Sequence, residues 1–195
     1  LMCGLAGFFG SSFNSEFGES VLNSMGNQIA HRGPDDNGTW LDANTSIGLV
    51  HRRLAIQDLS REGHQPMFSK NKRYVLVYNG EIYNFKHLRQ ELKKKGTFFS
   101  GYSDTEVLLA AITLWGIKEA VKRLIGMFAF ALWDRELKIL VLARDRIGEK
   151  PLYYGWQGKS FLFGSELKAL KKHPEFKGEI DRDSLCLLLR YNNIS

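Results

Sequence analysis

The sequence predicts a mixed α+β fold, in which mostly antiparallel strands are covered by helices. Short segments rich in Val, Ile, Phe and Tyr recur along the chain, and segments with apolar residues at helical spacing separate them. Several strand-like segments are apolar on both faces, which is typical of strands that a second sheet or helices cover on each side. The expected strands are residues 4–9, 38–41, 46–51, 74–79, 127–133, 138–143, 152–155 and 160–164.

Helical periodicity defines the segments between the strands. Apolar residues three or four positions apart mark one face of each helix, as in Leu22, Met25 and Ile29, or in Leu88 and Leu92. Because no internal repeat or low-complexity linker interrupts the order, we interpret residues 3–182 as one domain. The expected helices are residues 16–30, 85–95, 104–115 and 118–124, the last two divided by a glycine.

A further helix is expected over residues 183–190, with Asp181 or Asp183 as its cap. Its apolar residues, which include Cys186 and run from Leu185 to Leu189, surround the helix almost completely, and such a helix needs a packing partner. We therefore expect residues 183–195 to begin the connection to a second domain beyond the given sequence. Contact with another copy of the chain, as in a homodimer, is the alternative.

The composition narrows the class of protein. With 195 residues, 44% hydrophobic and 25% charged, the chain is neither a disordered tail nor a disulfide miniprotein. Two cysteines, and five histidines without ligand spacing, predict no metal site. The absence of a leader or a long apolar run favours a cytoplasmic protein without a membrane partner. The net charge of +6 lacks an accompanying nucleic-acid-binding motif, so no nucleic-acid partner is expected.

Cys3 directly follows Met2 and precedes small residues that enter the first strand. Removal of Met2 by an aminopeptidase would make Cys3 the first residue, provided Leu1, an expected vector remnant, is also absent. The α-amine of an N-terminal cysteine has a pKa of about 7.7–8.0, so it can accept the proton of its own thiol. The alternative is that Cys3 is a small buried hydrophobic residue, as most lone cysteines are.

Several polar motifs stand at the ends of the expected strands and helices. Each has a structural explanation: Asn79-Gly80 is typical of a tight turn, and Ser103 with Glu106 is typical of a capping box. The motifs are M-C-G-x-x-G at 2–7, H-R-G-P-D-D at 31–36, H-R-R-L at 51–54, Y-N-G-E-I-Y-N at 78–84, S-D-T-E at 103–106, G-M-F-A-F-A-L-W-D at 126–134 and R-D-R-I-G-E-K-P-L-Y-Y at 144–154.

In this order, the motifs resemble the glutaminase domain of the asparagine synthetases, which are class II glutamine amidotransferases. The resemblance covers nearly the whole chain. It implies the N-terminal-nucleophile hydrolase fold, a four-layer α/β/β/α sandwich of two mostly antiparallel sheets flanked by helices. It also implies that residues 3–182 are a type-2 glutamine amidotransferase domain, and that residues 183–195 lead to a C-terminal synthetase domain.

The resemblance assigns roles to individual residues. Cys3 matches the nucleophile that forms a thioester with glutamine, and Asn79 and Gly80 match the donors to the oxyanion. Glycine is expected at position 80 because a Cβ would crowd the substrate. Arg53 matches the residue that pairs with the α-carboxylate of glutamine, and Asp104, together with Glu81, fits the partner of its α-ammonium. Main-chain hydrogen bonds to glutamine are expected from Leu54, Ala55, Ile56 and Gln57.

The function that the resemblance implies is hydrolysis of L-glutamine to glutamate and ammonia, with ammonia passed to an ATP-dependent synthetase domain of the same protein for asparagine synthesis. No cofactor is expected in this domain, and ATP and Mg²⁺ are expected only in the synthetase domain, because no Walker loop occurs here. Two alternatives stay open: a non-catalytic docking or substrate-sensing domain with the same fold, and the glutaminase half of a sugar-modifying amidotransferase.

Overall fold

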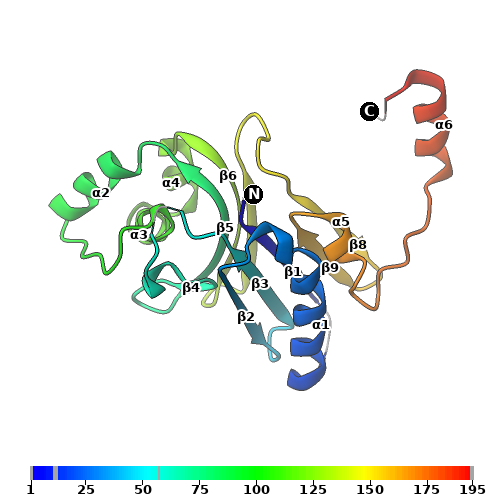
Figure 1. Ribbon diagram of the computed structural model, residues 1–195, viewed down its shortest axis with the longest axis horizontal. Coiled ribbons are helices and arrows are strands. Elements are labelled where there is room, and N and C mark those ends of the chain that lie inside the picture. The colour runs from blue at the N-terminus through cyan, green and yellow to red at the C-terminus, as the bar shows by residue number, and fades with distance from the viewer. Residues whose placement is uncertain (1, 11–12, 57, 194–195) are drawn as a thin grey trace.

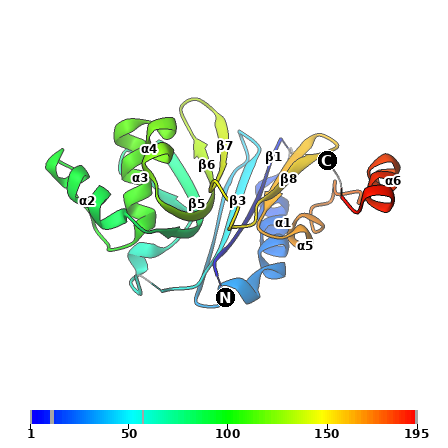
Figure 2. The same cartoon turned by 90° about the horizontal axis from the view of Figure 1, so that it is seen from above.

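A computed structural model describes residues 2–10, 13–56 and 58–193 as four layers, with two sheets packed face to face between two layers of helices (Figures 1 and 2). The first sheet has the strand order β2-β3-β1-β9-β8 and the second β4-β5-β6-β7, and every strand pair within the described residues is antiparallel. The predicted α/β/β/α sandwich is therefore confirmed.

The five strands of the first sheet come from both ends of the chain. Strand β1, the first after Cys3, lies at the centre of this sheet and pairs with β3 on one side and β9 on the other. The strands are β1 (Gly4–Phe9), β2 (Asp36–Asp42), β3 (Ile47–Arg53), β8 (Tyr153–Gln157) and β9 (Ser160–Gly164). A central position for β1 fixes the N-terminal residues at one end of the sandwich (Figure 2).

The second sheet is built around the long antiparallel pair β5 and β6. Strand β4 pairs with Val75 and Leu76 of β5, so among the described residues the later part of β5 has no neighbouring strand on that side. The strands are β4 (Met67–Phe68), β5 (Tyr74–Ile82), β6 (Gly126–Asp134) and β7 (Ile139–Arg144). The two-residue strand β4 was not predicted, because two residues are too few to show any periodicity.

Helices cover the outer face of each sheet. Helix α1 (Ser15–Gln28), the turn η1 (Ala30–Arg32) and α5 (Leu167–Leu170) lie on the first sheet. Helices α2 (Phe85–Lys94), α3 (Asp104–Trp115) and α4 (Ile117–Arg123) lie on the second. Gly116, at φ 78°, divides α3 from α4 as predicted, because this left-handed backbone is readily adopted by glycine.

Alternation along the strands produces three apolar layers. In β5, Val75 and Val77 face the other sheet, whereas Leu76 and Tyr78 face helices α2 to α4. In β1, Leu5 faces the sheet interface while Ala6 and Phe8 pack on α1. Because both faces of the central strands are buried, these strands read as nearly continuous apolar runs in the sequence.

Helix α6 (Arg182–Tyr191) stands apart from the body of the molecule (Figures 1 and 2). Asp181 caps it by accepting hydrogen bonds from Asp183 N and Ser184 N, which settles the choice between the two predicted caps. Cys186 is exposed, and no residue of α6 is buried against the described chain. That the helix needs a partner stays a prediction.

Candidate active site

A pocket lies where the N-terminus, the ends of β3 and β5, and the start of α3 meet. Its lining combines polar and apolar side chains, as ligand pockets do. Most of the site residues predicted from the sequence line it. The lining residues are Met2, Cys3, Arg53, Leu54, Ile56, Asp58, Gly63, Gln65, Tyr78, Asn79, Gly80, Glu81, Ser103, Asp104, Thr105, Met127 and Lys150.

Cys3 directly precedes β1, and its thiol contacts the main chain that follows β3. Leu54 N donates to Cys3 Sγ at 3.3 Å, and the thiol donates to Leu54 O at 3.6 Å. Burial raises the pKa of the thiol, and hydrogen bonds from Leu54 N–H and from the N–H of Cys3 itself oppose that rise. The neutral thiol is thus favoured here, and a base is needed to generate the thiolate.

The main chain of Cys3 is held by the first polar motif. Arg32 Nε donates to Cys3 O at 3.1 Å, and Arg32 Nη1 donates to Glu166 at 2.7 Å, just before α5. Glu166 also pairs with Lys168 at 2.9 Å. Helix-flanking charges from both ends of the chain therefore fix the residue that carries the thiol, which explains the arginine of the H-R-G-P-D-D motif.

Asn79 presents an unused donor in the same pocket as this thiol. Its side chain is 1% exposed and lines the pocket together with Cys3. Among the described residues, Asn79 Nδ2 has no hydrogen-bond partner. A buried amide without a partner costs free energy, so its retention in a pocket is typical of a group that binds something there. The site thus contains an amide donor that is free to bind a ligand oxygen in the pocket of the Cys3 thiol.

Gly80 adds a main-chain donor at the uncovered edge of β5. Its register partner in β6, Phe128, directs its N–H to Asp145 Oδ2 (3.2 Å) and its C=O to Asp145 N (2.8 Å). Gly80 and Phe128 therefore form a pair without mutual hydrogen bonds, and the N–H of Gly80 points away from β6. On the same edge, Tyr78 N donates to Gln65, which lines the pocket.

One sequence interpretation of this segment is wrong: Asn79-Gly80 does not form a tight turn, because both residues lie inside β5. The structure also gives a reason for glycine at position 80 within the fold, since a Cβ there would lie 2.4 Å from Met127 O and 2.7 Å from Phe128 Cα. Close approach of β5 to β6 therefore requires this glycine, independently of any substrate.

Arg53, at the end of β3, places a cation inside the pocket. The residue is 8% exposed, and its guanidinium donates to Ser60 O (2.9 Å) and to Asp58 O. A Cβ at Gly63 would lie 2.0 Å from Arg53 Nη2, so only glycine lets the guanidinium occupy this position. Two of its N–H groups are thereby committed to the protein, and Asp36 Oδ2 lies 4.0 Å from Nη1. The remaining N–H groups can bind an anionic ligand.

Asp104 supplies the anion, at the first residue of α3. It is 6% exposed, and its Oδ2 accepts from the Tyr78 hydroxyl (2.8 Å) and from Ile82 N (2.9 Å). Burial raises the pKa of this carboxyl, whereas those two donors oppose the rise. Within the described chain Asp104 forms no ion pair, so a cationic ligand would stabilise its charged form.

The predicted capping box next to Asp104 is confirmed in one half only. Ser103 Oγ accepts from Glu106 N at 3.2 Å and caps α3. The carboxylate of Glu106 does not return to Ser103 N; it accepts from Ser100 N (2.7 Å) and Gly101 N (3.0 Å). The reciprocal bond is replaced because the loop before the helix offers these two amides.

The remaining predicted ligands differ in their placement. Ile56 and Glu81 line the pocket and are exposed, and Leu54 lines it with its main chain engaged by Cys3. Ala55 is not among the lining residues, and its N–H donates to Asp35 at 2.8 Å. The predicted glutamine contact at Gln57 lies outside the described residues.

Sequence reasoning missed several residues that shape the site, chiefly Gly63, Gln65, Tyr78 and Lys150. Tyr78 and Lys150 stand inside recognised motifs, which was a usable signal. Gly63 and Gln65 carry no local signal, because their contacts reach across the fold. His51 was also read without a role: it donates from Nε2 to Tyr78 O at 2.9 Å, and burial lowers its pKa to about 4.

Among the described residues, no group of three or more His, Cys, Asp or Glu could hold a metal ion. In the same part of the chain, no helix has the length and apolar character needed to cross a membrane. The chemistry that the pocket offers is that of a thiol, amide donors and two buried charges of opposite sign.

Comparison with known proteins decides the family. Residues 2–195 match the model of the glutamine amidotransferase domain. The chain belongs to the glutamine amidotransferase domain family. It is 41% identical, over 94% of its length, to asparagine synthetase [glutamine-hydrolyzing] 3 of Bacillus subtilis, of which it covers 30%. It is 39% identical, over 95% of its length, to the putative asparagine synthetase [glutamine-hydrolyzing] 2 of Methanocaldococcus jannaschii, of which it covers 38%.

Solved structures support the fold of this glutamine amidotransferase domain. The glutamine phosphoribosylpyrophosphate amidotransferase of B. subtilis superposes with a TM-score of 0.69 at 24% identity, over 87% of this chain and 43% of that one. The chain therefore has the fold of an amidotransferase and spans about a third of the length of the asparagine synthetases it matches. The predicted family is confirmed.

Proposed function

We propose that this glutamine amidotransferase domain hydrolyses L-glutamine with Cys3 as the nucleophile and supplies the ammonia to a synthetase domain of the same protein. The observation that carries the proposal is the meeting of the Cys3 thiol and the unpartnered Asn79 amide in one pocket with buried Arg53 and Asp104. A nucleophile, an oxyanion donor and two opposite charges are the groups that the chemistry requires.

The two buried charges match the free amino acid end of glutamine. Its α-carboxylate would accept from the uncommitted N–H groups of Arg53, and its α-ammonium would donate to Asp104. Glu81, exposed at the pocket, adds a second carboxylate to its lining. Binding at both groups would direct the side-chain amide of glutamine toward Cys3.

The chemistry then proceeds in two balanced steps. The α-amine of Cys3 takes the thiol proton, and the thiolate attacks the amide carbon. Asn79 Nδ2 and Gly80 N–H stabilise the resulting oxyanion. When the C–N bond breaks, the α-ammonium returns the proton to the leaving group, which departs as ammonia and leaves a thioester. Water, deprotonated by the α-amine, then attacks the thioester, and glutamate leaves as the thiol is restored.

Removal of the residues before Cys3 is required for this mechanism. While Met2 is attached, the nitrogen of Cys3 belongs to a peptide bond and cannot accept a proton. Met2 also lines the pocket, so its side chain competes with glutamine for space. The peptide N–H of Cys3 donates to its own thiol, so the nitrogen lies close to the sulfur; a free amine at this place would instead accept the thiol proton.

The acceptor belongs to the remainder of the protein. We propose aspartate as the acceptor, which the relatives named asparagine synthetase support, and we propose that ATP and Mg²⁺ bind to the synthetase domain. We also propose that the domain boundary lies near residue 182, that α6 begins the connection, and that the protein acts in the cytoplasm. A homodimer would be a second way to cover α6, whose leucines are exposed.

The test compares three purified forms: a chain that begins at Cys3, the chain that retains Leu1 and Met2, and a Cys3→Ala variant that begins at residue 3. Glutamate release from glutamine and labelling by a glutamine-like electrophile are measured for each. Only the first form should be active and labelled. The proposal is wrong if that form, correctly folded, shows neither reaction.

A further inference from the structure

Lys150 is a buried cation in the pocket that the proposed mechanism does not use. It is 3% exposed and lines the pocket. Its Nζ donates to the thioether sulfurs of Met2 at 2.6 Å and Met127 at 2.9 Å. Within the described chain Lys150 forms no ion pair, and a thioether is a weak acceptor for an ammonium group. A buried ammonium with such partners is costly for the fold, which points to a role in the site.

The loop before β8 is built to hold Lys150 in place. The carboxylate of Asp145 accepts hydrogen bonds from the main-chain amides of Ile147, Gly148, Glu149 and Lys150 at 2.7 to 3.2 Å. Arg144 Nε donates to Lys150 O at 2.6 Å. This network accounts for the R-D-R-I-G-E-K motif: its side chains fix a loop whose last residue enters the pocket.

Lys150 lies close to the nitrogen of Cys3. Met2 Sδ, which Lys150 contacts, is joined to Cys3 N by a short run of covalent bonds that spans at most about 6 Å. The ammonium is therefore within about 9 Å of that nitrogen. Removal of Met2 takes away a thioether partner of Lys150 and creates an amine in the same pocket.

We propose that Lys150 is a positioning residue for the charge of the active site: it keeps the N-terminal amine of the processed chain in its free-base form near neutral pH. The inference rests on the proposed function, because an amine that serves as a base must be unprotonated when glutamine binds. A fixed positive charge nearby disfavours protonation of the amine, and it also makes the ammonium a better proton donor to departing ammonia.

The other cations around the amine do not by themselves keep it in its free-base form. Arg32 is neutralised by Glu166, and Arg53 lies beside the carbonyls of the loop that follows β3. The carboxyls of Asp104 and Glu81 act in the opposite direction, since a negative charge favours the protonated amine. The charged and titratable groups around the amine and Lys150 are Arg32 and Glu166, Arg53 of β3, Asp58 of the loop that follows it, Tyr78 and Glu81 of β5, Asp104 of α3, and Asp145, Glu149 and Lys150 of the loop before β8.

The test measures the pH profile of kcat/KM for glutamine hydrolysis in chains that begin at Cys3. Lys150→Met removes the charge and matches the surrounding thioethers, and we expect the acid limb to move upward by about half a pH unit or more. Lys150→Arg keeps the charge at every pH, although burial lowers the pKa of the native lysine. Its acid limb should stay at or below that of the parent chain.

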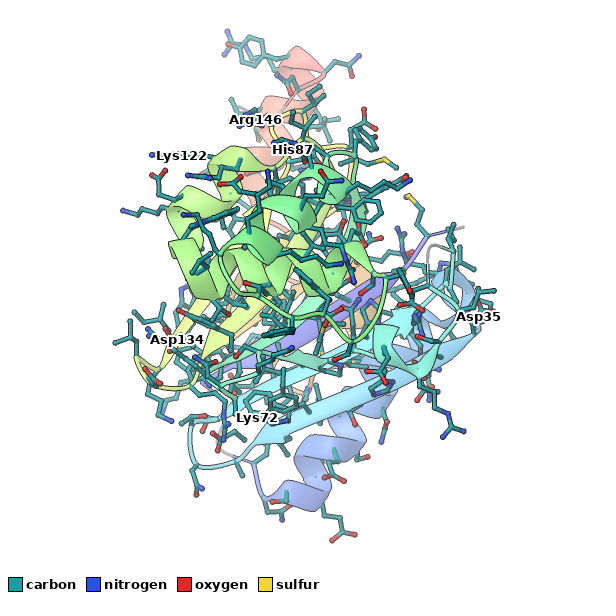
Figure 3. All side chains as sticks on the ribbon, turned by 90° about the vertical axis from the view of Figure 1, so that its left-hand side faces the viewer. Asp35, Lys72, His87, Lys122, Asp134 and Arg146 are labelled. Carbon is teal, nitrogen blue, oxygen red and sulfur yellow. The ribbon has the colours of Figure 1, made fainter. Side chains whose placement is uncertain are left out.

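Lys122→Met is the matched control, because Lys122 is an exposed residue of α4 paired with Glu119 (Figure 3). It should leave the profile unchanged. Thermal unfolding identifies any variant that fails to fold, in which case Lys150→Gln replaces Lys150→Met. The pKa of the α-amine is also measured directly, from the pH dependence of its acylation in a Cys3→Ala background.

The outcomes separate the two proposals. An inactive parent chain overturns the proposed function. An active parent chain with the same acid limb and the same α-amine titration in folded Lys150→Met overturns only the role of Lys150. A loss of thermal stability without a shift in either titration would likewise assign Lys150 a purely structural role.

Discussion

Asp104 and Asp134 are both buried carboxylates beside strand β5, yet only Asp134 has a cation. Asp134 pairs in register with Tyr74 at the start of the strand, whereas Asp104 contacts Tyr78 and Ile82 toward its end. Arg73 donates from Nε and Nη2 to Asp134, the shortest contact being 2.7 Å. Figure 3 shows Asp134 on the opposite side of the molecule from Asp35, which marks the pocket end.

The pKa values of the two carboxyls are shifted in opposite directions. Burial acts to raise the pKa of Asp134, but hydrogen bonds from Arg73 and from the amides of Leu137 and Glu136 outweigh it and lower the pKa. At Asp104, burial prevails and the pKa is raised. The fold thus satisfies one carboxylate completely and leaves the other in need of a cation, which distinguishes a structural end of the sandwich from a functional end.

The largest expected effect is a loss of activity at the functional end of the sandwich, on substitution of Asn79. Asn79→Ala should lower kcat for glutamine hydrolysis by about 10²–10³, because it removes an oxyanion donor. Stability should change little through hydrogen bonding, since Asn79 Nδ2 has no partner among the described residues. Steady-state kinetics and thermal unfolding together check both expectations.

Asn84 provides the matched control in the same motif. Its Oδ1 accepts from Ile125 N (3.0 Å) and its Nδ2 donates to Arg123 O (2.9 Å), so its amide joins two segments of the fold. Asn84→Ala should therefore reduce stability by about 1–2 kcal/mol and leave kcat nearly intact. The reverse pattern, with activity lost at Asn84 and stability lost at Asn79, would contradict the division between the two amides.

The second effect concerns Asp104. Asp104→Asn keeps an oxygen for Tyr78 and Ile82 but removes the charge, so kcat/KM should fall by about 10- to 100-fold, mainly through KM. The pKa of Asp104 is raised in the folded state, so ionisation above that pKa destabilises the wild type. The variant should be at least as stable at pH 7, and this advantage should vanish as the pH falls below the unfolded value of about 3.9.

The third effect concerns Asp134, whose substitution should lower stability, in contrast to substitution of Asp104. Asp134→Asn replaces an acceptor oxygen among donors from Arg73, Glu136 and Leu137, and should lower the free energy of unfolding by about 2 kcal/mol. The folded pKa is depressed, so the contribution is present above about pH 3.9 and is lost as the pH falls through the folded pKa. Denaturant titrations at pH 7 and at falling pH measure it; KM for glutamine should not change.

Much of the fold was predictable because its signals are local. The strands β1, β5, β6 and β9 are apolar on both faces, and the helices α2 and α3 show clear periodicity. The motifs placed Cys3, Arg53, Asn79 and Asp104 in one pocket, as the resemblance implied. Local signals fail where a residue's role is set by a distant segment. Gly80 is required by β6, and Cys186 is exposed because nothing in the described chain covers α6.

Gly63 is a residue whose role is set by a distant segment, and its substitution gives the smallest expected effect on activity. No motif marks it, yet a Cβ there would lie 2.0 Å from Arg53 Nη2. Because the guanidinium is the mobile end of its side chain, Gly63→Ala should displace it without unfolding the domain, and KM for glutamine should rise by about tenfold. Gly155→Ala is the control, since a Cβ at position 155 meets no atom within 4 Å. An unchanged KM in folded Gly63→Ala would mean that the position of Arg53 does not govern glutamine binding, and the functional end would then rest on Asp104 alone.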